Sequence, residues 1–190
     1  ILFFDIETTG FTANNTYLYL IGCIYADKSS LHMIQWFAED IGEEALVISN
    51  FFEFIKGYDL LVHYNGSGFD IPYLTKKCAI YQMDYSFDHI KNLDIYKVIS
   101  PVKKIFGLKN FKQKSIEGFL NVKREDTLGG GDLISVYQSY LGKKRIEKLK
   151  KARNQQSNDD DALRETEQLL HLLLQHNEDD IKGLVRICPI

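Results

Sequence analysis

The chain has 190 residues, is 45% hydrophobic and 13% aromatic, and has a net charge of −3. This length and composition predict one α/β domain, residues 1–190, with a full-sized hydrophobic core. No apolar run reaches the length of a membrane span and no signal-peptide pattern is found, so we expect a cytoplasmic protein. The charge gives no overall signal for nucleic-acid binding, although a site made of carboxylates would itself lower the total.

The cysteines and the first residue give two further expectations. Cys23, Cys78 and Cys188 lie far apart in apolar contexts, without the spacing of metal ligands. We therefore expect buried thiols in a reducing compartment. A strand pattern is already under way at Ile1, which leads us to expect a domain from a longer protein that has other domains.

Two acids close the first strand pattern. The apolar residues 1–4 lead directly into Asp5, Ile6 and Glu7, and Thr8-Thr9-Gly10 then turns the chain. Side chains alternate between the faces of a strand, so Asp5 and Glu7 share a face. Adjacent carboxylates resist ionisation, and a shared divalent cation removes that conflict. Oxygen ligands of this kind suit Mg²⁺ or Mn²⁺. The alternative is an edge strand with a solvated acidic face.

The next elements predict the sheet. We expect strands at 17–26 and 31–37, a helix at 43–56, a strand at 59–63, a helix from about 70 to 78 and a fifth strand at 89–98. The order is β-β-β-α-β-α-β, which predicts a five-stranded mixed sheet with the first strand in the middle and helices on both faces. Three strands would be antiparallel and two parallel.

The second half reads as mainly helical. Residues 101–120 are mixed, 125–132 form a glycine-rich loop, 133–141 and 163–174 are helices, and 157–161 is a polar linker. Between them lies a basic run of Lys143, Lys144, Arg145, Lys148, Lys150, Lys151 and Arg153. Such a run is either a solvated helix face or a contact for a phosphate backbone. His171, in the apolar helix, is expected to be packed or half-exposed and not a ligand.

Three later positions have both a structural and a functional interpretation. Asp70 follows a glycine loop and precedes Pro72, so it either caps a helix or lies at the strand-end position where α/β sheets bind ligands. Asp94 either orients the side chains of the site or only stabilises the fold. His176 and Asp180 are four residues apart, which places them on one helix face. Their segment could also be the acidic first turn of a helix.

Together these motifs resemble the DEDD superfamily of 3′-5′ exonucleases, on the ribonuclease H-like fold. Asp5-Ile6-Glu7-Thr8-Thr9-Gly10 is similar to the first motif. Residues 64–74 resemble the second motif as it occurs in the proofreading domains of family B polymerases, and residues 176–181 resemble the third. The intervening segments 94–96, 107–109 and 129–130 resemble the YprB-like group of predicted exonucleases. One feature departs from the pattern: the superfamily has Tyr four residues before the last Asp, or His five before it, and this chain has His176 at the tyrosine spacing.

The resemblance implies a two-metal hydrolysis that uses Mg²⁺ or Mn²⁺. Asp5 would bridge both ions. Glu7 and Asp180 would complete the site of the ion that holds the attacking water, and Asp70 would serve the second ion. His176 would orient the water and accept its proton.

The resemblance also implies the substrate contacts. The terminal base and sugar would be bound by Thr8, Thr9, Gly10, Asn65, Phe69 and Tyr73, with stacking on the aromatic rings. The product would be a nucleoside 5′-monophosphate released from the 3′ end of a single strand. DNA and RNA both stay open as substrates, because discrimination of the 2′-OH depends on pocket geometry. Two alternatives are a nucleic-acid-binding module with a dead site, and a phosphodiesterase for short oligonucleotides or an endonuclease of the same fold.

Overall fold

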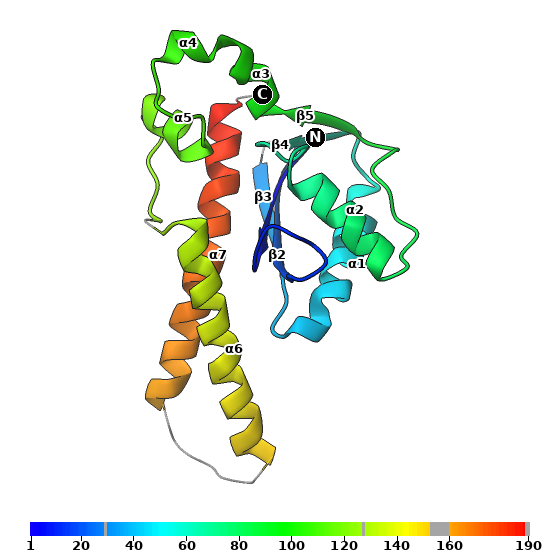
Figure 1. Ribbon diagram of the computed structural model, residues 1–190, viewed down its shortest axis with the longest axis vertical. Coiled ribbons are helices and arrows are strands. Elements are labelled where there is room, and N and C mark those ends of the chain that lie inside the picture. Colours follow the sequence, from blue (N-terminus) through cyan, green and yellow to red (C-terminus); the bar gives the residue numbers. More distant parts are fainter. Residues whose placement is uncertain (29, 127, 153–159, 189–190) are drawn as a thin grey trace.

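One sheet organises the molecule. The computed structural model describes residues 1–28, 30–126, 128–152 and 160–188. Its five strands have the order β3-β2-β1-β4-β5 (Figure 1). They are β1 (Leu2–Thr8), β2 (Leu18–Asp27), β3 (Ser30–Phe37), β4 (Leu60–His63) and β5 (Lys91–Asp94). β1 pairs antiparallel with β2 and parallel with β4, which confirms the predicted mixed sheet and excludes an edge position for Asp5.

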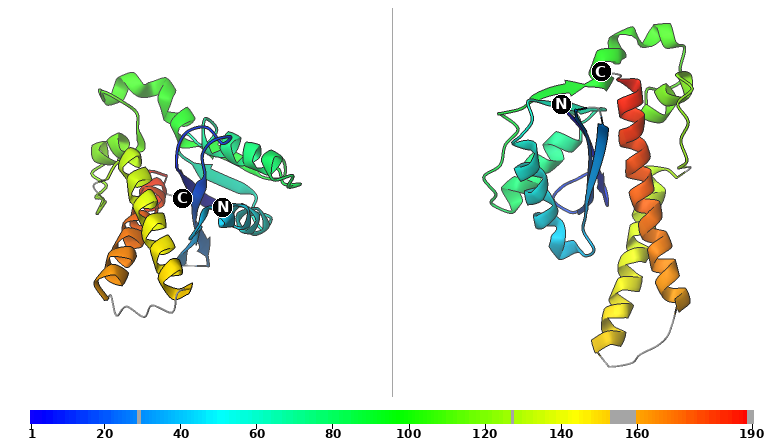
Figure 2. Two further views of the ribbon diagram at one scale, coloured as in Figure 1. Left: turned by 60° about the horizontal axis from the view of Figure 1, so that its bottom comes forward. Right: turned by 180° about the vertical axis from the view of Figure 1, so that it is seen from behind.

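Helices cover both faces of this sheet (Figure 2). They are η1 (Ile41–Glu43), α1 (Glu44–Ile55), α2 (Asp70–Ile80), α3 (Ile95–Ile99), η2 (Ser100–Val102), α4 (Lys103–Phe106), α5 (Gln113–Phe119), α6 (Gly130–Ala152) and α7 (Asp160–Ile187). α1 and α2 lie on one face, and α7 crosses the other. α6 packs along α7, and this helical hairpin extends past the end of the sheet (Figure 1).

The alternation of β1 decides which helix meets the acids. Leu2, Phe4 and Ile6 belong to the core cluster that includes α1. Phe3 belongs to a separate cluster with Ile181 and Leu184 of α7. Because strand side chains alternate with period two, Asp5 and Glu7 lie on the face of Phe3, beneath α7.

Gly22 lets α7 lie close to the sheet at this point. It pairs with Asp5 across the β1–β2 ladder. A Cβ at Gly22 would lie 1.9 Å from Asn177 Oδ1 and 2.4 Å from Ile181 Cδ1, so another residue fits only if these two side chains of α7 move. The absent side chain therefore sets the distance between α7 and the acids of β1.

Three predicted elements need correction. The fifth strand ends at Asp94, not at residue 98, because the Asp94 carboxylate accepts from the Lys97 amide and caps α3. The predicted helix 133–141 and the basic run as far as Lys151 belong to one helix, α6, which already begins at Gly130. Residues 176–180 lie inside α7, which has 28 residues, and are not the first turn of a separate helix.

Two predicted features fall outside the described residues. They are most of the polar linker 157–161 and Arg153, the last residue of the basic run. Cys23 and Cys78 are buried free thiols, as predicted, whereas Cys188 is only half-buried. Among the described helices, none combines the length and the apolar character needed to cross a membrane.

Candidate active site

Asp70 is brought to the strand that carries the first two acids. It is the first residue of α2, is buried, and its Oδ1 accepts a hydrogen bond from the Ile6 amide at 3.3 Å. Its side chain does not cap α2, where Phe69 occupies the N-cap position, so the capping interpretation is wrong. The Ile6 amide lies between Asp5 and Glu7, and this bond therefore holds Asp70 beside both.

α7 adds His176 and Asp180 from above. Their atoms Nε2 and Oδ2 are 3.4 Å apart, and His176 Nε2 is 3.8 Å from Glu7 Oε1. Within the described part of the chain, Glu7, His176 and Asp180 offer metal-ligand atoms that all lie within 4.8 Å of one another. Asp5 and Asp70 do not belong to this tight group, although both influence it electrostatically.

The acids oppose one another's ionisation. Burial raises the pKa of Asp5 well above its usual range, and Asp180, Asp70 and Glu7 raise it further. Burial, Asp180 and Asp70 likewise raise the pKa of Glu7. The pKa of Asp70 is raised to about 7, mainly by burial, against hydrogen bonds from backbone amides that lower it. Charge repulsion among closely spaced, largely buried carboxylates is the condition that a bound cation relieves.

Asn177 fixes the orientation of Asp5. Its amide nitrogen lies 3.1 Å from Asp5 Oδ2, and its Oδ1 accepts from Gln35 Nε2 at 3.0 Å. The Gln35 amide also donates to the backbone carbonyl of Leu174. This chain of bonds ties β3 and α7 to the acid at the centre of the sheet. Asn177 belongs to the motif 176–181, but the sequence alone did not indicate a role for it.

A second group that sequence reasoning missed is the segment from Arg124 to Asp126. The backbone amides of Glu125 and Asp126 donate to Asp179 Oδ2 at 2.8 and 2.7 Å, which docks the segment on α7. Arg124 then lies 2.5 Å from Asp180 Oδ1. Asp126 Oδ2 lies 2.7 Å from His176 Nδ1, although the ring is not aligned for a hydrogen bond.

These contacts determine the state of His176. Burial lowers the pKa of this buried ring below its ordinary value, against Asp180 and Asp126, which raise it. An unprotonated Nδ1 would place a lone pair 2.7 Å from a carboxylate oxygen, which is repulsive. In a neutral ring, a proton on Nδ1 removes this repulsion and leaves the lone pair of Nε2 facing Glu7 and Asp180.

A buried ion pair holds the loop after β1. Lys77 Nζ lies 2.9 Å from Glu44 Oε1 and donates to the Thr16 carbonyl at 2.6 Å. Glu44 also accepts from the Leu18 amide at 2.6 Å and from the Tyr81 hydroxyl. The start of β2 is thus fixed to α1 and α2, which limits the movement of residues 9–17.

The expected substrate contacts lie around this loop. The Thr8 hydroxyl donates to the Gly10 carbonyl, and the Thr9 hydroxyl accepts from the Tyr17 amide. Tyr73 is buried, with its hydroxyl 2.9 Å from the Thr16 hydroxyl. A surface pocket between the loop and α2 is lined by Phe11, Thr12, Ala13, Asn14, Gly68, Phe69, Pro72, Tyr73 and Lys76. Of the six expected residues, Phe69 and Tyr73 line it, and the Phe69 ring packs edge-on against exposed Phe11.

Asn65 does not line this pocket and lies in the loop between β4 and α2. Its backbone has a φ of 60°, and its amide donates to Asp94 Oδ1 at 2.9 Å. The Ser67 amide donates to the other Asp94 oxygen at 3.2 Å. Asp94 thus shapes the loop that leads to Asp70, which agrees with the structural interpretation.

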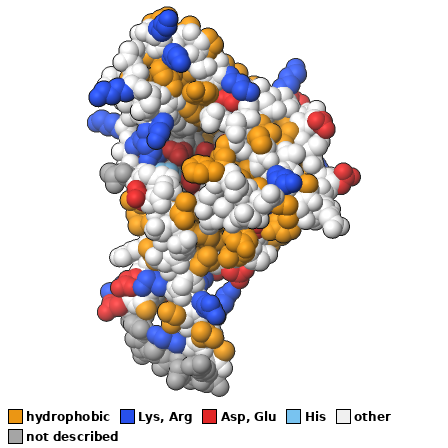
Figure 3. All heavy atoms as spheres, viewed as in Figure 1, with side chains coloured by type: hydrophobic (Ala, Val, Ile, Leu, Met, Phe, Trp, Pro, Cys, Tyr) orange, Lys and Arg blue, Asp and Glu red, His pale blue; other side chains and the backbone are white. Residues whose placement is uncertain are grey.

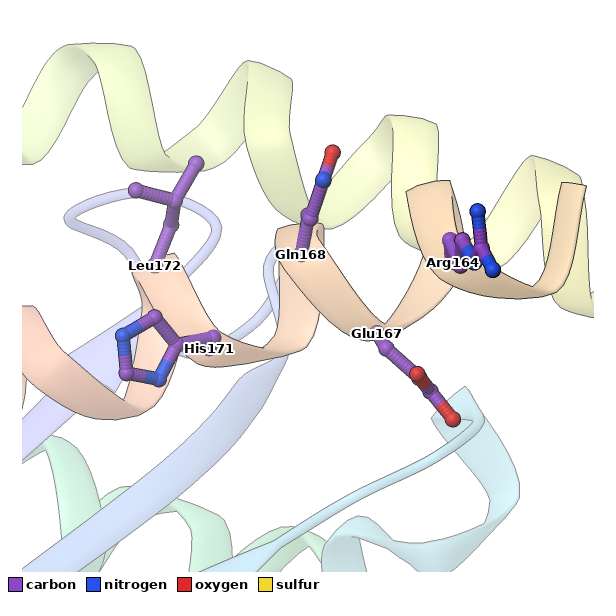
Figure 4. A pocket seen from close by; sticks show the side chains of 5 residues that line it. All are labelled: Arg164, Glu167, Gln168, His171 and Leu172. Atoms are coloured by element: carbon purple, nitrogen blue, oxygen red, sulfur yellow. The ribbon is translucent and has the colours of Figure 1, made fainter. Parts of the chain in front are cut away.

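Two other groups lie apart from the acids. His171 is exposed and, with Arg164, Glu167, Gln168 and Leu172, lines a surface pocket along α7 (Figure 4). In the basic run, Lys143 pairs with Glu165, Lys144 with Glu39 and Lys148 with Asp40. These ion pairs weaken the expectation that the run contacts a phosphate backbone.

The fold and the carboxylate-lined face define an α/β protein of the RNase H-like class. A family model described as the RNase H superfamily matches residues 2–189, and the chain belongs to this superfamily. The predicted fold class is thereby confirmed, and membership of this superfamily supports a nuclease. A comparison with curated proteins found no match.

Solved structures show the same fold. The family B DNA polymerase from the hyperthermophilic archaeon Pyrobaculum calidifontis is 16% identical, with a TM-score of 0.65 over 97% of this chain and 24% of its own. A structure of exonuclease I is 12% identical, with a TM-score of 0.52 over 66% of this chain and 36% of its own. The chain thus spans about a quarter and about a third of these two proteins.

The residues present fit a divalent cation. The donor set is made of carboxylate oxygens and one imidazole nitrogen, and RNase H-like nucleases generally use divalent metals. Hard oxygen ligands favour Mg²⁺ or Mn²⁺ over softer metals. The raised pKa values of Asp5 and Glu7 give an independent reason, since the site is electrostatically unfavourable without a cation.

Proposed function

We propose that this domain is a metal-dependent 3′-5′ exonuclease that releases nucleoside 5′-monophosphates from a single-stranded 3′ end. The observation that carries the proposal is the convergence of four mutually repelling acids, Asp5, Glu7, Asp70 and Asp180, beside a histidine. The motif pattern further favours the YprB-like group within the DEDD superfamily, and we place the protein in the cytoplasm.

The four acids would hold two divalent cations, Mg²⁺ or Mn²⁺. When bound, such cations stabilise the charge on a phosphate and make water easier to deprotonate. Asn177 keeps Asp5 in place through its side-chain amide, and the Ile6 amide does the same for Asp70. These two bonds hold Asp5 and Asp70 in place before a ligand arrives.

His176 would act as the general base. Its lowered pKa keeps the ring neutral near pH 7, so that Nε2 can accept a proton from the attacking water. Asp126 keeps the proton of the neutral ring on Nδ1 and stabilises the imidazolium that forms. The loop held by Lys77 and Glu44 would place the terminal base against Phe69.

An end-label assay tests the proposal. Matched single-stranded DNA and RNA, labelled at the 5′ or the 3′ end, are incubated with Mg²⁺ or Mn²⁺. We expect a ladder that shortens from the 3′ end, immediate release of the 3′ label as a mononucleotide, and no reaction in EDTA. Asp5→Ala should abolish cleavage in a folded protein. Internal cleavage of strands blocked at the 3′ end would instead assign an endonuclease.

One contact favours a second candidate, a nucleic-acid-binding module with a dead site. Arg124 lies 2.5 Å from Asp180 Oδ1 and thereby neutralises one of the acids. Asp180 Oδ2 nevertheless faces His176, which leaves one oxygen directed into the site. Isothermal titration with Mn²⁺ separates the candidates, because a dead site should bind no pair of ions.

A further inference from the structure

An uninterrupted basic segment lies next to the acidic site. Residues 95–119, which we name the lysine arch, comprise α3, η2, α4 and α5 and curve over the end of α7 (Figure 1). Between residues 95 and 116 the sequence contains no Asp or Glu. It contains six lysines in the same interval, Lys97, Lys103, Lys104, Lys109, Lys112 and Lys114. The arch is therefore strongly positive in a chain whose total charge is negative.

The outer lysines of the arch are free to bind a ligand. Lys97, Lys103, Lys104, Lys109 and Lys112 are exposed, and no described residue forms an ion pair with them. The basic run of α6 differs, because three of its lysines already pair with acids of this chain. Unpaired lysines grouped on one surface indicate an anionic partner.

Apolar side chains alternate with these lysines. Ile105 is 82% exposed, and Val98, Val102 and Phe119 are also exposed. The Phe106 ring packs edge-on against Phe111 and Phe119, which forms a small aromatic cluster within the arch. Figure 3 shows Lys and Arg side chains together with hydrophobic ones over this end of the molecule, above a hollow with acidic side chains. Such a mixture suits a chain that has both phosphates and flat bases.

The second half of the arch is fixed to elements of the site. The Tyr64 hydroxyl, just after β4, donates to the Phe111 carbonyl at 2.7 Å. Gln113 Nε2 donates to the backbone carbonyl of Asp180 at 2.6 Å. Lys114 lies 3.0 Å from Asp126 Oδ2, beside His176. The positive surface thus begins one side chain from the proposed reaction centre.

We propose that the lysine arch binds the phosphodiester backbone of the single strand whose 3′ end occupies the site. This inference rests on the proposed function and adds the surface that receives the rest of the substrate. The strand would pass Lys114 and then Lys112 before it reaches Lys109 and α4. Exposed apolar residues of the arch would contact its bases without sequence preference.

Counterion release gives the expected magnitude. Each lysine that neutralises a phosphate of a single strand contributes about −0.7 to the slope of log K against log salt. Two lysines fewer should make the slope shallower by about 1.4. At 0.1 M salt, the same change should weaken binding by about 25-fold relative to the wild-type protein, since the effect vanishes toward 1 M salt.

The test compares two double variants of equal charge change. Lys104→Ala/Lys109→Ala removes two arch lysines, and Arg145→Ala/Lys151→Ala removes two exposed basic residues of α6. Affinity for a fluorescent single strand is measured by anisotropy in EDTA, where no cleavage occurs, over a series of salt concentrations. We expect the arch variant alone to lose affinity and slope. With Mn²⁺, its KM for a long strand should rise while its cleavage of a dinucleotide stays unchanged.

Other outcomes would overturn the inference. Equal losses in both double variants would mean that overall charge, and not the arch, attracts the strand. Unchanged affinity in the arch variant would show that the arch does not bind the strand. Failure of the proposed function is distinguishable, because the wild-type protein would then leave the strand intact with Mn²⁺ while the binding measurement in EDTA stays valid.

Discussion

Replacing Asp70 with Asn tests whether charge repulsion destabilises the metal-free site. Asn is nearly isosteric and retains an oxygen that can accept from the Ile6 amide. The wild-type carboxyl has a pKa of about 7 in the folded protein. Its ordinary value is near 3.9, and one pKa unit corresponds to about 1.4 kcal/mol. Asp70→Asn should therefore raise the free energy of unfolding by on the order of 4 kcal/mol at pH 8 without metal.

The pH dependence follows from the direction of the shift. Between about pH 4 and 7 the folded protein retains the Asp70 proton and the unfolded chain does not, so the wild-type stability falls as pH rises. The advantage of Asp70→Asn should thus shrink to about 1.5 kcal/mol at pH 5. Mn²⁺ at 100 times Kd should reduce the advantage of Asp70→Asn at pH 8 from about 4 to about 1.5 kcal/mol, because the wild-type protein gains about 2.7 kcal/mol from binding.

Urea unfolding at pH 5 and pH 8, with and without Mn²⁺, measures these differences. Asp84→Asn, at an exposed aspartate, is the matched control and should change stability little at either pH. The reasoning would be refuted if Asp70→Asn lowered the metal-free stability at pH 8, or if its effect did not vary with pH.

Three further variants test the placement of α7 and the state of His176. Gly22→Ala should lower the free energy of unfolding in urea by about 1–3 kcal/mol, since the new Cβ would lie 1.9 Å from Asn177 Oδ1. The control Gly142→Ala, whose Cβ would meet nothing within 4 Å, should not destabilise the protein. Equal stabilities of the two variants would contradict this packing. Asp126→Asn should lower the cleavage rate by roughly 10–100-fold, because an amide can donate to His176 Nδ1 and so favour the tautomer with its proton on Nε2. Nitrogen NMR of the His176 ring measures the tautomer, and an unchanged tautomer would show that Asp126 does not control it. His176→Ala should lose roughly 10²–10⁴-fold in rate with metal affinity nearly unchanged, and His176→Tyr should recover part of the rate because the spacing to Asp180 matches tyrosine; a wild-type rate in His176→Ala would remove it as the base.

Local patterns were sufficient to predict the sheet and the position of its acids. The alternation of β1 places Asp5 and Glu7 on one face in any sheet, and the short apolar run of β4 requires a parallel neighbour that is covered on both sides. A helical spacing of four likewise places His176 above Asp180. These relations depend on neighbouring residues only, and they therefore hold before the tertiary structure is known.

The contacts that hold the site together depend on packing between distant segments. Arg124 reaches Asp180 while the next two residues, Glu125 and Asp126, are docked on Asp179 of α7. Nothing in the sequence of residues 124–126 indicates this contact with α7, and the same residues would suit a solvent-exposed loop. The fifth strand was extended too far for a related reason, since the cap at Asp94 is decided by bonds to the loop after β4 as well as by its own sequence.

The most direct test of the central claim is anomalous diffraction from crystals soaked in Mn²⁺. We expect two manganese peaks beneath α7, with Asp5 as a ligand of both ions. Asp180 should be released from Arg124, and both peaks should be lost in Asp5→Ala. Absence of manganese from this face at saturating concentration, with the Arg124–Asp180 ion pair intact, would contradict it.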